Sequence, residues 1–330
     1  MLRLLDLPVV GQGIHRSGWP YARRALEPLH VPGSQLLLDD FAERTFLYDE
    51  RWNGGLCHDS PWVGIFHHPP DVPGWCFEHF CLDRSAMRWS ARWRASARRL
   101  ELAICLADHV TDWARSELGV PAVTIRHPSE IPARTFTLDA YAKNGRKRLV
   151  QVGTFLRNTR AIDQVAAPGF LEKTRLRQDA EGARAHDAAC DRQNAARARP
   201  RANVGRVEEL GPQHDDAYDA LLSENVVLVE LVCAAANNTI VECIARSTPV
   251  AVNRLPGVEF YLGREYPLFF DGLDEVPGLL SDDRIAAAHG YLSRMDKSWL
   301  AASSFREAVR AACAPVAERL PPRRWWSRAR

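Results

Sequence analysis

The strongest constraint on the fold comes from the stretch "NVVLVELVCAAANNTIVECIARSTPVAVN" at residues 225–253. An apolar run at 226–231 is followed by small residues and two asparagines, then by helical spacing at 239–247 and a second apolar run at 250–253. Short apolar runs bounded by turn residues are typical of buried strands. Because a strand, a helix and a strand follow one another, the stretch predicts a βαβ unit with a parallel sheet.

A second stretch of the same kind, "LELAICLADHVTDWARSELGVPAVTI", lies in the N-terminal half. It predicts a strand at 102–107, a helix with Asp108 as its N-cap that ends at Gly119, and a strand at 120–125. Further short apolar runs at "WVGIFHH" and "RLVQVG" read as additional buried strands. Two such sets of elements predict two α/β sheets.

The length of 330 residues exceeds what one hydrophobic core usually covers, so two domains are expected. The polar segment "KNGRKR" is the best candidate boundary. We therefore predict an N-terminal Rossmann-like domain at residues 1–143, a C-terminal one at 144–295, and a terminal helix with a basic aromatic tail at 296–330. Residues 171–206 are charged and rich in alanine, which favours an exposed helix or a mobile insertion.

Composition narrows the functional classes. With 46% apolar residues, 25% charged residues and a net charge of +2, the chain is typical of globular proteins and not of nucleic-acid binders. Its eight cysteines are scattered without a CxxC pair, which favours a reducing cytoplasm. No run approaches about 18 uninterrupted apolar residues, so we expect no membrane-spanning helix.

The segment "AAANNTIVE" is the first candidate site. Small residues at 234–236 allow a ligand to approach the backbone, and Asn237, Asn238 and Thr239 stand at the start of a helix, where N–H groups and the helix dipole favour an anion such as a diphosphate. Glu242, one turn further, can accept hydrogen bonds from ribose hydroxyls. The alternative is a capping box from Thr239 to Glu242, which needs no ligand.

Two other segments follow predicted strands. In "VGTFLRNTR", Gly153 permits a tight turn and Arg157 can neutralise a departing phosphate, although a surface arginine is the alternative. In "FHHPPDVPGWC", His67 and His68 can position a hydroxyl or act as a base, unless one packs beneath the loop and the other faces solvent. His127 in "RHP" is a similar candidate, either in a cleft or at a capped strand end.

The same region contains side chains of the types that bind zinc. A zinc site there would use the following side chains: His67, His68, Cys76, His79 and Cys81. Their spacing matches none of the usual tetrahedral zinc patterns, so no metal site is predicted.

Basic and aromatic residues suggest contact with an anionic membrane surface. Arg84, Arg88 and Arg92 share one stripe of a predicted helix, and the tail contains "RRWWSR". A solvated helix face and a disordered tail are the alternatives.

Taken together, the segments from "WVGIFHHPP" to "YPLFF" resemble a glycosyltransferase of the GT-B type, with two Rossmann-like domains and parallel sheets that face each other across a cleft. "NNTIVECIARSTPVAVN" is similar to the donor-binding segment of bacterial family-4-like (group 1) enzymes. The resemblance implies that Glu242 holds the ribose, that residues 237–239 hold the diphosphate, and that Gly153 and Arg157 face the leaving phosphate.

The resemblance further implies a metal-independent, retaining hexosyltransferase. The donor would be a UDP- or GDP-linked sugar and the acceptor a hydroxyl of a glycan, a lipid-linked saccharide or a small molecule, with no other cofactor. The family places a glutamate eight residues before Glu242, where this chain has Ala234. A catalytically inactive GT-B-like module that binds a sugar nucleotide or scaffolds a glycan pathway is therefore the alternative. A dinucleotide enzyme is disfavoured because no GxGxxG follows any predicted strand.

Overall fold

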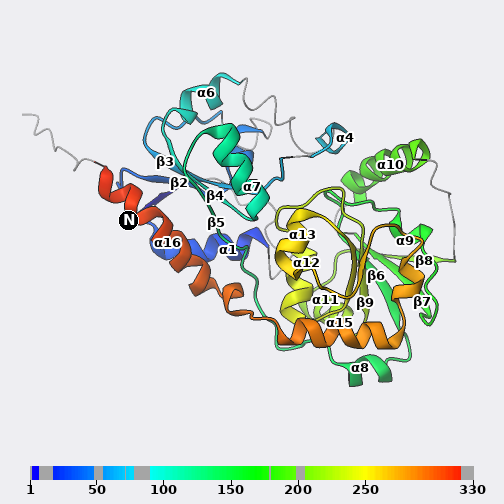
Figure 1. Cartoon of the computed structure of the whole chain (residues 1–330). Helices are drawn as coiled ribbons and strands as arrows, with labels where there is room; N and C mark the ends of the chain where they lie inside the picture. Colours follow the sequence, from blue (N-terminus) through cyan, green and yellow to red (C-terminus); the bar gives the residue numbers. More distant parts are fainter. Residues whose placement is uncertain are drawn as a thin grey trace, which may run out of the picture.

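A computed structural model describes residues 2–6, 18–47, 55–70, 72–77, 90–177, 180–197 and 205–320. Within these ranges the chain forms two α/β units, each built on a parallel sheet (Figure 1). The first unit is drawn from blue to cyan, and the second from green to orange.

The first sheet follows the order of the chain. Its strands are β1 (Arg3–Leu4), β2 (Leu37–Asp39), β3 (Trp62–Phe66), β4 (Leu100–Cys105) and β5 (Ala122–Thr124). Neighbouring strands pair in parallel, in the order β1-β2-β3-β4-β5. The helices of this unit are α1 (Trp19–Leu26), α2 (Ala42–Phe46), α4 (Gly74–Phe77), α6 (Ala91–Ala97) and α7 (Asp108–Trp113), which continues as a π-helical turn, η2 (Ala114–Leu118).

The strands of the second sheet are all parallel, but the order in which the chain adds them reverses in the middle of the sheet. Its strands are β6 (Arg148–Val152), β7 (Glu172–Leu176), β8 (Val207–Leu210), β9 (Val226–Val229), β10 (Val250–Asn253) and β11 (Phe269–Phe270). They pair in parallel in the order β11-β10-β9-β6-β7-β8. Its helices are α8 (Leu138–Lys143), α9 (Ala161–Gln164), α10 (Ala180–Ala196), α11 (Asp215–Ser223), α12 (Asn238–Arg246), α13 (Pro256–Leu262), α14 (Val276–Leu279) and α15 (Asp282–Arg294).

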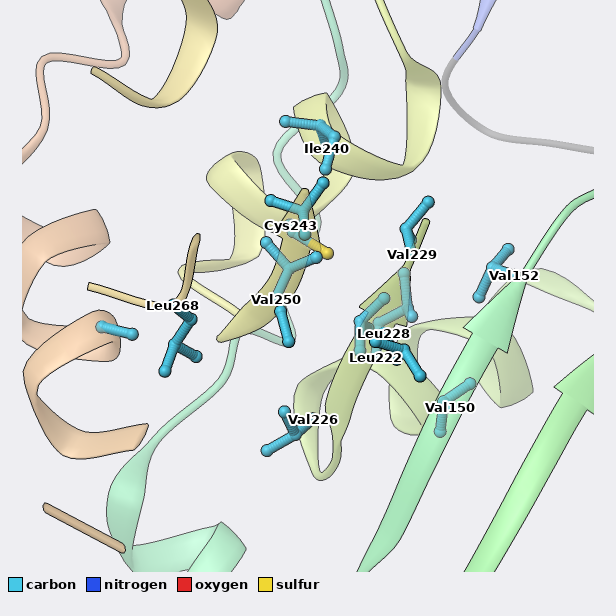
Figure 2. Packing of buried hydrophobic residues seen from close by; sticks show 14 of the residues in the cluster. Val150, Val152, Leu222, Val226, Leu228, Val229, Ile240, Cys243, Val250 and Leu268 are labelled. Carbon is cyan, nitrogen blue, oxygen red and sulfur yellow. The ribbon is translucent and has the colours of Figure 1, made fainter. Parts of the chain in front are cut away.

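The core of the second unit explains why its strands read as continuous apolar runs. All four residues of β9 are fully buried, because helices cover both faces of a parallel sheet. Figure 2 shows Val226, Leu228 and Val229 of this strand among side chains from β6, β10, α11 and α12. Ile240 and Cys243 lie one turn apart on α12 and bury the same helix face.

The last helix returns to the first unit. After η3 (Ser298–Leu300), α16 (Ala302–Arg319) packs beside α1 and β4. Phe305, Val309 and Cys313 recur every four residues and join the same buried cluster as Leu26 and Ile104. Figure 1 shows α16, in red, running back along the first unit next to α1. The two units are therefore linked by two crossings of the chain.

One expectation is wrong. Residues 171–206 contain β7, which lies inside the second sheet between β6 and β8, in addition to α10. Polar side chains occupy this strand, and Lys173, Thr174 and Arg175 are nonetheless buried. Lys173 donates to the carbonyl oxygens of Ile162 and Val165 at 2.8 and 3.2 Å, which satisfies its buried ammonium group.

Smaller differences concern the ends of elements. Ala107, and not Asp108, is the N-cap of α7, and Gly119 ends the π-helical turn with φ +65°. Phe136 and Tyr141, which precede the expected domain boundary, are buried in the core of the second unit. No helix in the described part of the chain is both long and apolar enough to cross a membrane.

Candidate functional site

The second sheet has a topological switch point between β6 and β9. From β6 the chain moves to β7 and β8 on one side, and from β9 it moves to β10 and β11 on the other. In open α/β sheets the loops after two such strands separate and leave a crevice at their carboxyl ends. Here these loops carry residues 153–160 and 230–237, so both predicted donor-site segments meet at this point.

A cavity of about 240 Å³ opens at the switch point between the two units; we call it the interdomain cavity. Leu156, Arg157 and residues 233–238 form its wall on the second unit. The wall on the first unit is formed by Trp19, Phe41, His67, His68, Pro69, Leu106 and His127. The fold thus brings together residues from three separate candidate segments of the sequence: His67, His68, Arg157, Asn237 and Asn238.

The loop after β6 places Arg157 against the backbone of Gly153. Gly153 has φ +80°, and a Cβ there would lie 2.9 Å from Cζ of Arg157. Leu156 also has a positive φ, of 57°, which is uncommon for a residue other than glycine. Strained backbone of this kind is often found at functional sites.

The guanidinium of Arg157 is buried, with only 8% of the residue exposed. It donates to the carbonyl of Phe155 at 2.8 Å, to Thr239 Oγ1 at 3.0 Å and to Asn237 Oδ1 at 3.3 Å. In the described ranges its Nε has no hydrogen-bond partner, and Arg157 forms no ion pair with a carboxylate. A buried cation held only by neutral groups is costly, and an anionic ligand would offset that cost.

Burial lowers the pKa of Arg157 to about 10, although Tyr218 and Glu242 act in the opposite direction. The guanidinium therefore stays protonated at neutral pH.

Helix α12 begins at the cavity. Its N-cap is Asn237, whose Oδ1 accepts the N–H of Ile240 at 3.3 Å. Thr239 is thus the second residue of the helix, so the capping box from Thr239 to Glu242 is excluded. Thr239 does not line the cavity but anchors Arg157 through its hydroxyl.

Glu242 lies behind this helix start and does not line the cavity. It is 2% exposed, and its Oε2 accepts a hydrogen bond from the hydroxyl of Tyr218 on α11. Burial raises the pKa of Tyr218 well above its usual value, and the neighbouring Glu242 adds to this effect. The assignment of Glu242 as a ribose ligand stays a prediction.

Opposite Arg157, the loop after β3 is fixed by a carboxylate of the same unit. Glu43 on α2 accepts the backbone N–H groups of His67 and His68 at 2.9–3.0 Å. The ring of His67 stacks on Phe41 at 4.1 Å and meets the edge of Trp19 at 4.0 Å. His68 is 3% exposed, His67 is partly buried, and both line the cavity.

Trp19 is held by Asp40, which accepts its Nε1–H at 2.8 Å and also contacts Arg44 and Arg23. Burial raises the pKa of Asp40 and outweighs the opposite effect of the two arginines. Trp19 and Phe41 were not among the site residues expected from the sequence. They lie in the part of the chain with the weakest periodicity, and only the fold brings them to the end of β3.

The two units also touch behind the cavity. The hydroxyl of Tyr261 on α13 donates to the carbonyl of Leu106 at 2.8 Å and accepts the backbone N–H of His127 at 2.9 Å. These bonds join α13 of the second unit to the ends of β4 and β5.

The other candidate regions offer weaker support for a binding site than the interdomain cavity does. A groove of about 450 Å³ lies between α7 and α13, but the basic side chain of Arg254 is paired there with Glu259 at 3.1 Å. In the described ranges no group of three or more His, Cys, Asp or Glu side chains could hold a metal ion. His79, Cys81, Arg84, Arg88 and the tail at 321–330 lie outside the described residues.

The fold is similar to that of known proteins, although the sequence is not. No protein-family model and no curated protein matches the sequence. Solved structures of several proteins are similar to this one over most of the chain. Sucrose-phosphate synthase from Thermosynechococcus elongatus is 18% identical, with a TM-score of 0.52 over 87% of this chain and 72% of its own.

The Anabaena protein HepE, in complex with UDP and glucose, is 12% identical, with a TM-score of 0.58 over 90% of this chain and 82% of its own. The UDP-forming α,α-trehalose-phosphate synthase from Burkholderia vietnamiensis is 13% identical, with a TM-score of 0.54 over 90% and 76%. With its two parallel α/β units and these structural neighbours, the chain has the GT-B glycosyltransferase fold.

Proposed function

We propose that this protein is a glycosyltransferase that moves a hexose from a nucleoside diphosphate-sugar to a hydroxyl acceptor without a metal ion. The observation that carries the proposal is Arg157, a buried cation at the topological switch point and the N-terminus of α12. A diphosphate at this position would receive the remaining donor of Arg157 and lie at the positive end of the helix dipole.

In the transfer, the bond between the anomeric carbon and the diphosphate oxygen breaks, and a bond from the acceptor oxygen to that carbon forms. The hydroxyl proton of the acceptor leaves to the released diphosphate or to water. Negative charge develops on the leaving diphosphate, and Arg157 with the start of α12 would stabilise it. Burial of the site between two units would exclude water and align donor with acceptor.

The neighbours support the nature of the donor. HepE was solved with UDP and glucose, and the trehalose-phosphate synthase is UDP-forming. A trehalose-6-phosphate synthase of the same fold transfers its glycosyl group with retention. We therefore propose a UDP-linked hexose as the first donor to test and retention as the outcome, which the anomeric configuration of the product would decide.

The second candidate is a catalytically inactive module that binds a sugar nucleotide. It is favoured by Ala234, which stands where the resembling family has a glutamate, and by Glu242, which bonds to Tyr218 instead of lining the cavity. Saturable binding of UDP without transfer to any acceptor and without donor hydrolysis would select this candidate.

The decisive experiment is thermal stabilisation of the full chain by UDP, GDP, dTDP, CMP and NAD, followed by release of UDP from UDP-glucose. We expect one nucleoside diphosphate to stabilise the protein. Arg157→Ala should lower the affinity for that nucleotide roughly 10- to 100-fold, because a hydrogen bond to a charged group contributes about 1.5–3 kcal/mol. The nucleotide affinity of Arg157→Lys should lie between those of wild type and Arg157→Ala, since lysine keeps the charge but not the planar geometry.

Arg310→Ala is the control, because Arg310 lies exposed on α16 and, among the described residues, forms its ion pair with Glu307. Equal stabilisation of wild type and Arg157→Ala by every nucleotide would remove the main physical support for the proposal. Stabilisation by NAD alone would point to a dinucleotide enzyme.

A further inference from the structure

The wall of the interdomain cavity on the first unit is built from aromatic rings in mutual contact. Trp19 lies 4.0 Å from His67 and 5.6 Å from His127, measured between ring centroids, and His67 stacks on Phe41 at 4.1 Å. Rings of this kind provide a rigid surface for the apolar face of a ligand, with a small number of polar atoms to orient it.

The first of these polar atoms belongs to His127. Its Nδ1 lies 2.7 Å from the carbonyl oxygen of Pro128. A carbonyl oxygen can only accept a hydrogen bond, so Nδ1 carries the proton and Nε2 of the neutral ring is an acceptor. His127 is 3% exposed and lines the cavity, and in the described ranges its Nε2 has no hydrogen-bond partner.

The second acceptor belongs to His67. Its Nε2 lies 3.0 Å from the carbonyl oxygen of Asp40, so Nε2 carries the proton and Nδ1 is left as an acceptor. Burial lowers the pKa of His67 to about 3, against the effect of Glu43, and lowers that of His127 to about 4. Both rings are thus neutral at physiological pH, and each offers a lone pair.

The charges behind this wall are already paired. Arg23 and Arg44 contact Asp40 at 3.5 and 3.1 Å, and Glu43 accepts the backbone N–H groups of the histidine loop. Among the described residues of the first unit that line the cavity, none carries a guanidinium or an ammonium group. The cation of the cavity, Arg157, belongs to the opposite wall. Among the described lining residues, the counter-charge for a phosphate therefore lies on the second unit.

We propose that the wall formed by Trp19, Phe41, His67 and His127 is the acceptor subsite and takes an uncharged sugar, not a sugar phosphate. The ring face of the sugar lies on the aromatic wall, and one hydroxyl donates a hydrogen bond to Nε2 of His127. This inference rests on the proposed function, and it separates this protein from neighbours named as sucrose-phosphate and trehalose-phosphate synthases.

The test measures binding to the full chain by saturation-transfer NMR, with and without UDP. The probes are the methyl α-glycosides of glucose, galactose and mannose, each compared with the 6-phosphate of the same sugar. His127→Asn keeps a donor near the position of Nδ1 and removes the Nε2 acceptor. His289→Asn is the matched control, because His289 Nδ1 also bonds to a backbone carbonyl, that of Ser247 at 2.9 Å, away from the cavity.

We expect at least one methyl glycoside to bind more tightly than its 6-phosphate counterpart. Its affinity should fall about tenfold or more in His127→Asn and stay unchanged in His289→Asn. Tighter binding of the sugar phosphates, equal affinity in the two variants, or no binding of any probe would overturn the inference. UDP stabilisation is measured separately: if UDP binds but phosphates are preferred, this inference fails alone. If UDP does not bind but a glycoside does, the transferase proposal fails and the sugar subsite stands.

Discussion

Arg157 lies directly over Gly153, and a Cβ at residue 153 would come within 2.9 Å of the guanidinium carbon. The chain thus uses a glycine for two reasons at once, since its φ of +80° also lies in the region that side chains rarely adopt. This contact holds the only charged side chain of the second-unit wall, among the described lining residues, at the end of β6.

Gly153→Ala should lower both stability and donor affinity. The positive φ alone costs about 1–2 kcal/mol, and the contact with Arg157 adds to it by moving the guanidinium. Gly169→Ala is a close control, because Gly169 has φ +82° and an added Cβ would meet nothing within 4 Å. Thermal denaturation and UDP titration of both variants check the prediction. An equal loss of UDP affinity in both would show that the contact with Arg157 is irrelevant.

Gly257→Ala should displace the loop after β9, which forms the second part of the proposed donor site. A Cβ at residue 257 would lie 2.1 Å from the carbonyl oxygen of Ala234 and 2.7 Å from that of Ala235, so the loop after β9 must shift. We expect a loss of about 1–3 kcal/mol in the free energy of unfolding and weaker UDP binding.

Gly278→Ala is the comparison for this variant, because residue 278 is also helical and has open space around it. It should be neutral or slightly stabilising, since alanine favours helices over glycine. Denaturant unfolding monitored by circular dichroism measures both. An unchanged midpoint in Gly257→Ala would contradict the contact.

The parts of the fold that could be predicted from the sequence share a local signal. β10 lies at 250–253 as expected, and β9 and α12 differ from the prediction by one or two residues at their ends. Their apolar residues are consecutive or helically spaced, so burial on both sheet faces is visible without knowledge of the partners.

β7 could not be predicted, because its buried polar side chains are stabilised by residues that lie elsewhere in the chain. Arg175 pairs with Asp163 and Glu209, which lie before and after it in the chain. A sequence pattern cannot show that the charges of "EKTRL" find these partners.

Some residues of the candidate site could likewise be predicted from the sequence, and others could not. Residues that follow strongly apolar strands, such as Arg157 and His67, could be selected, because the carboxyl ends of parallel strands meet at one edge. Trp19 and Phe41 could not, since their position depends on the hydrogen bond from Trp19 to Asp40 and on the packing of α16 behind α1.

Asp187→Ala should loosen the loop that carries Arg157. Asp187 on α10 accepts a hydrogen bond from Thr159 at 2.5 Å and pairs with Arg177 at 2.7 Å, and His186 donates from Nε2 to the carbonyl of Arg157 at 2.8 Å. Loss of this buried acceptor should cost about 1–3 kcal/mol and speed hydrogen exchange at residues 153–160.

Asp191→Ala on the same helix is the control, because Asp191 is partly exposed and, within the described part of the chain, pairs with Arg160. It should cost less than about 1 kcal/mol. Exchange rates at 153–160 that change equally in both variants would contradict a specific role for Asp187.

Stability should fall as the pH is lowered from about 6.5 toward 4. Burial lowers the pKa of His127 from 6.5 to about 4, so in this window the unfolded chain binds a proton that the folded chain does not. The free energy of unfolding therefore decreases with falling pH, by up to about 3 kcal/mol for this group. His67 acts with the same sign. Urea denaturation from pH 7 to 5 should show a shallower decrease in His127→Asn than in wild type; identical slopes would refute the assignment.

Tyr218→Phe should have opposite effects on the ligand-free protein and on the UDP complex. The hydroxyl of Tyr218 donates to the buried carboxylate of Glu242, so its loss should destabilise the ligand-free protein by about 1–3 kcal/mol. If Glu242 binds the ribose, the same hydroxyl competes with those of the ribose. UDP should then bind several-fold more tightly to Tyr218→Phe, and no longer do so when Glu242→Ala is added.

Pyrophosphate, which lacks the ribose, separates this effect from a general change of the site. Its affinity, measured by calorimetry beside that of UDP, should be the same in wild type and Tyr218→Phe. An equal change for UDP and pyrophosphate, or none for either, would leave Glu242 as a structural partner of Tyr218. The ribose would then have to be held by other residues, and the tie between α11 and α12 would be the whole role of this buried pair.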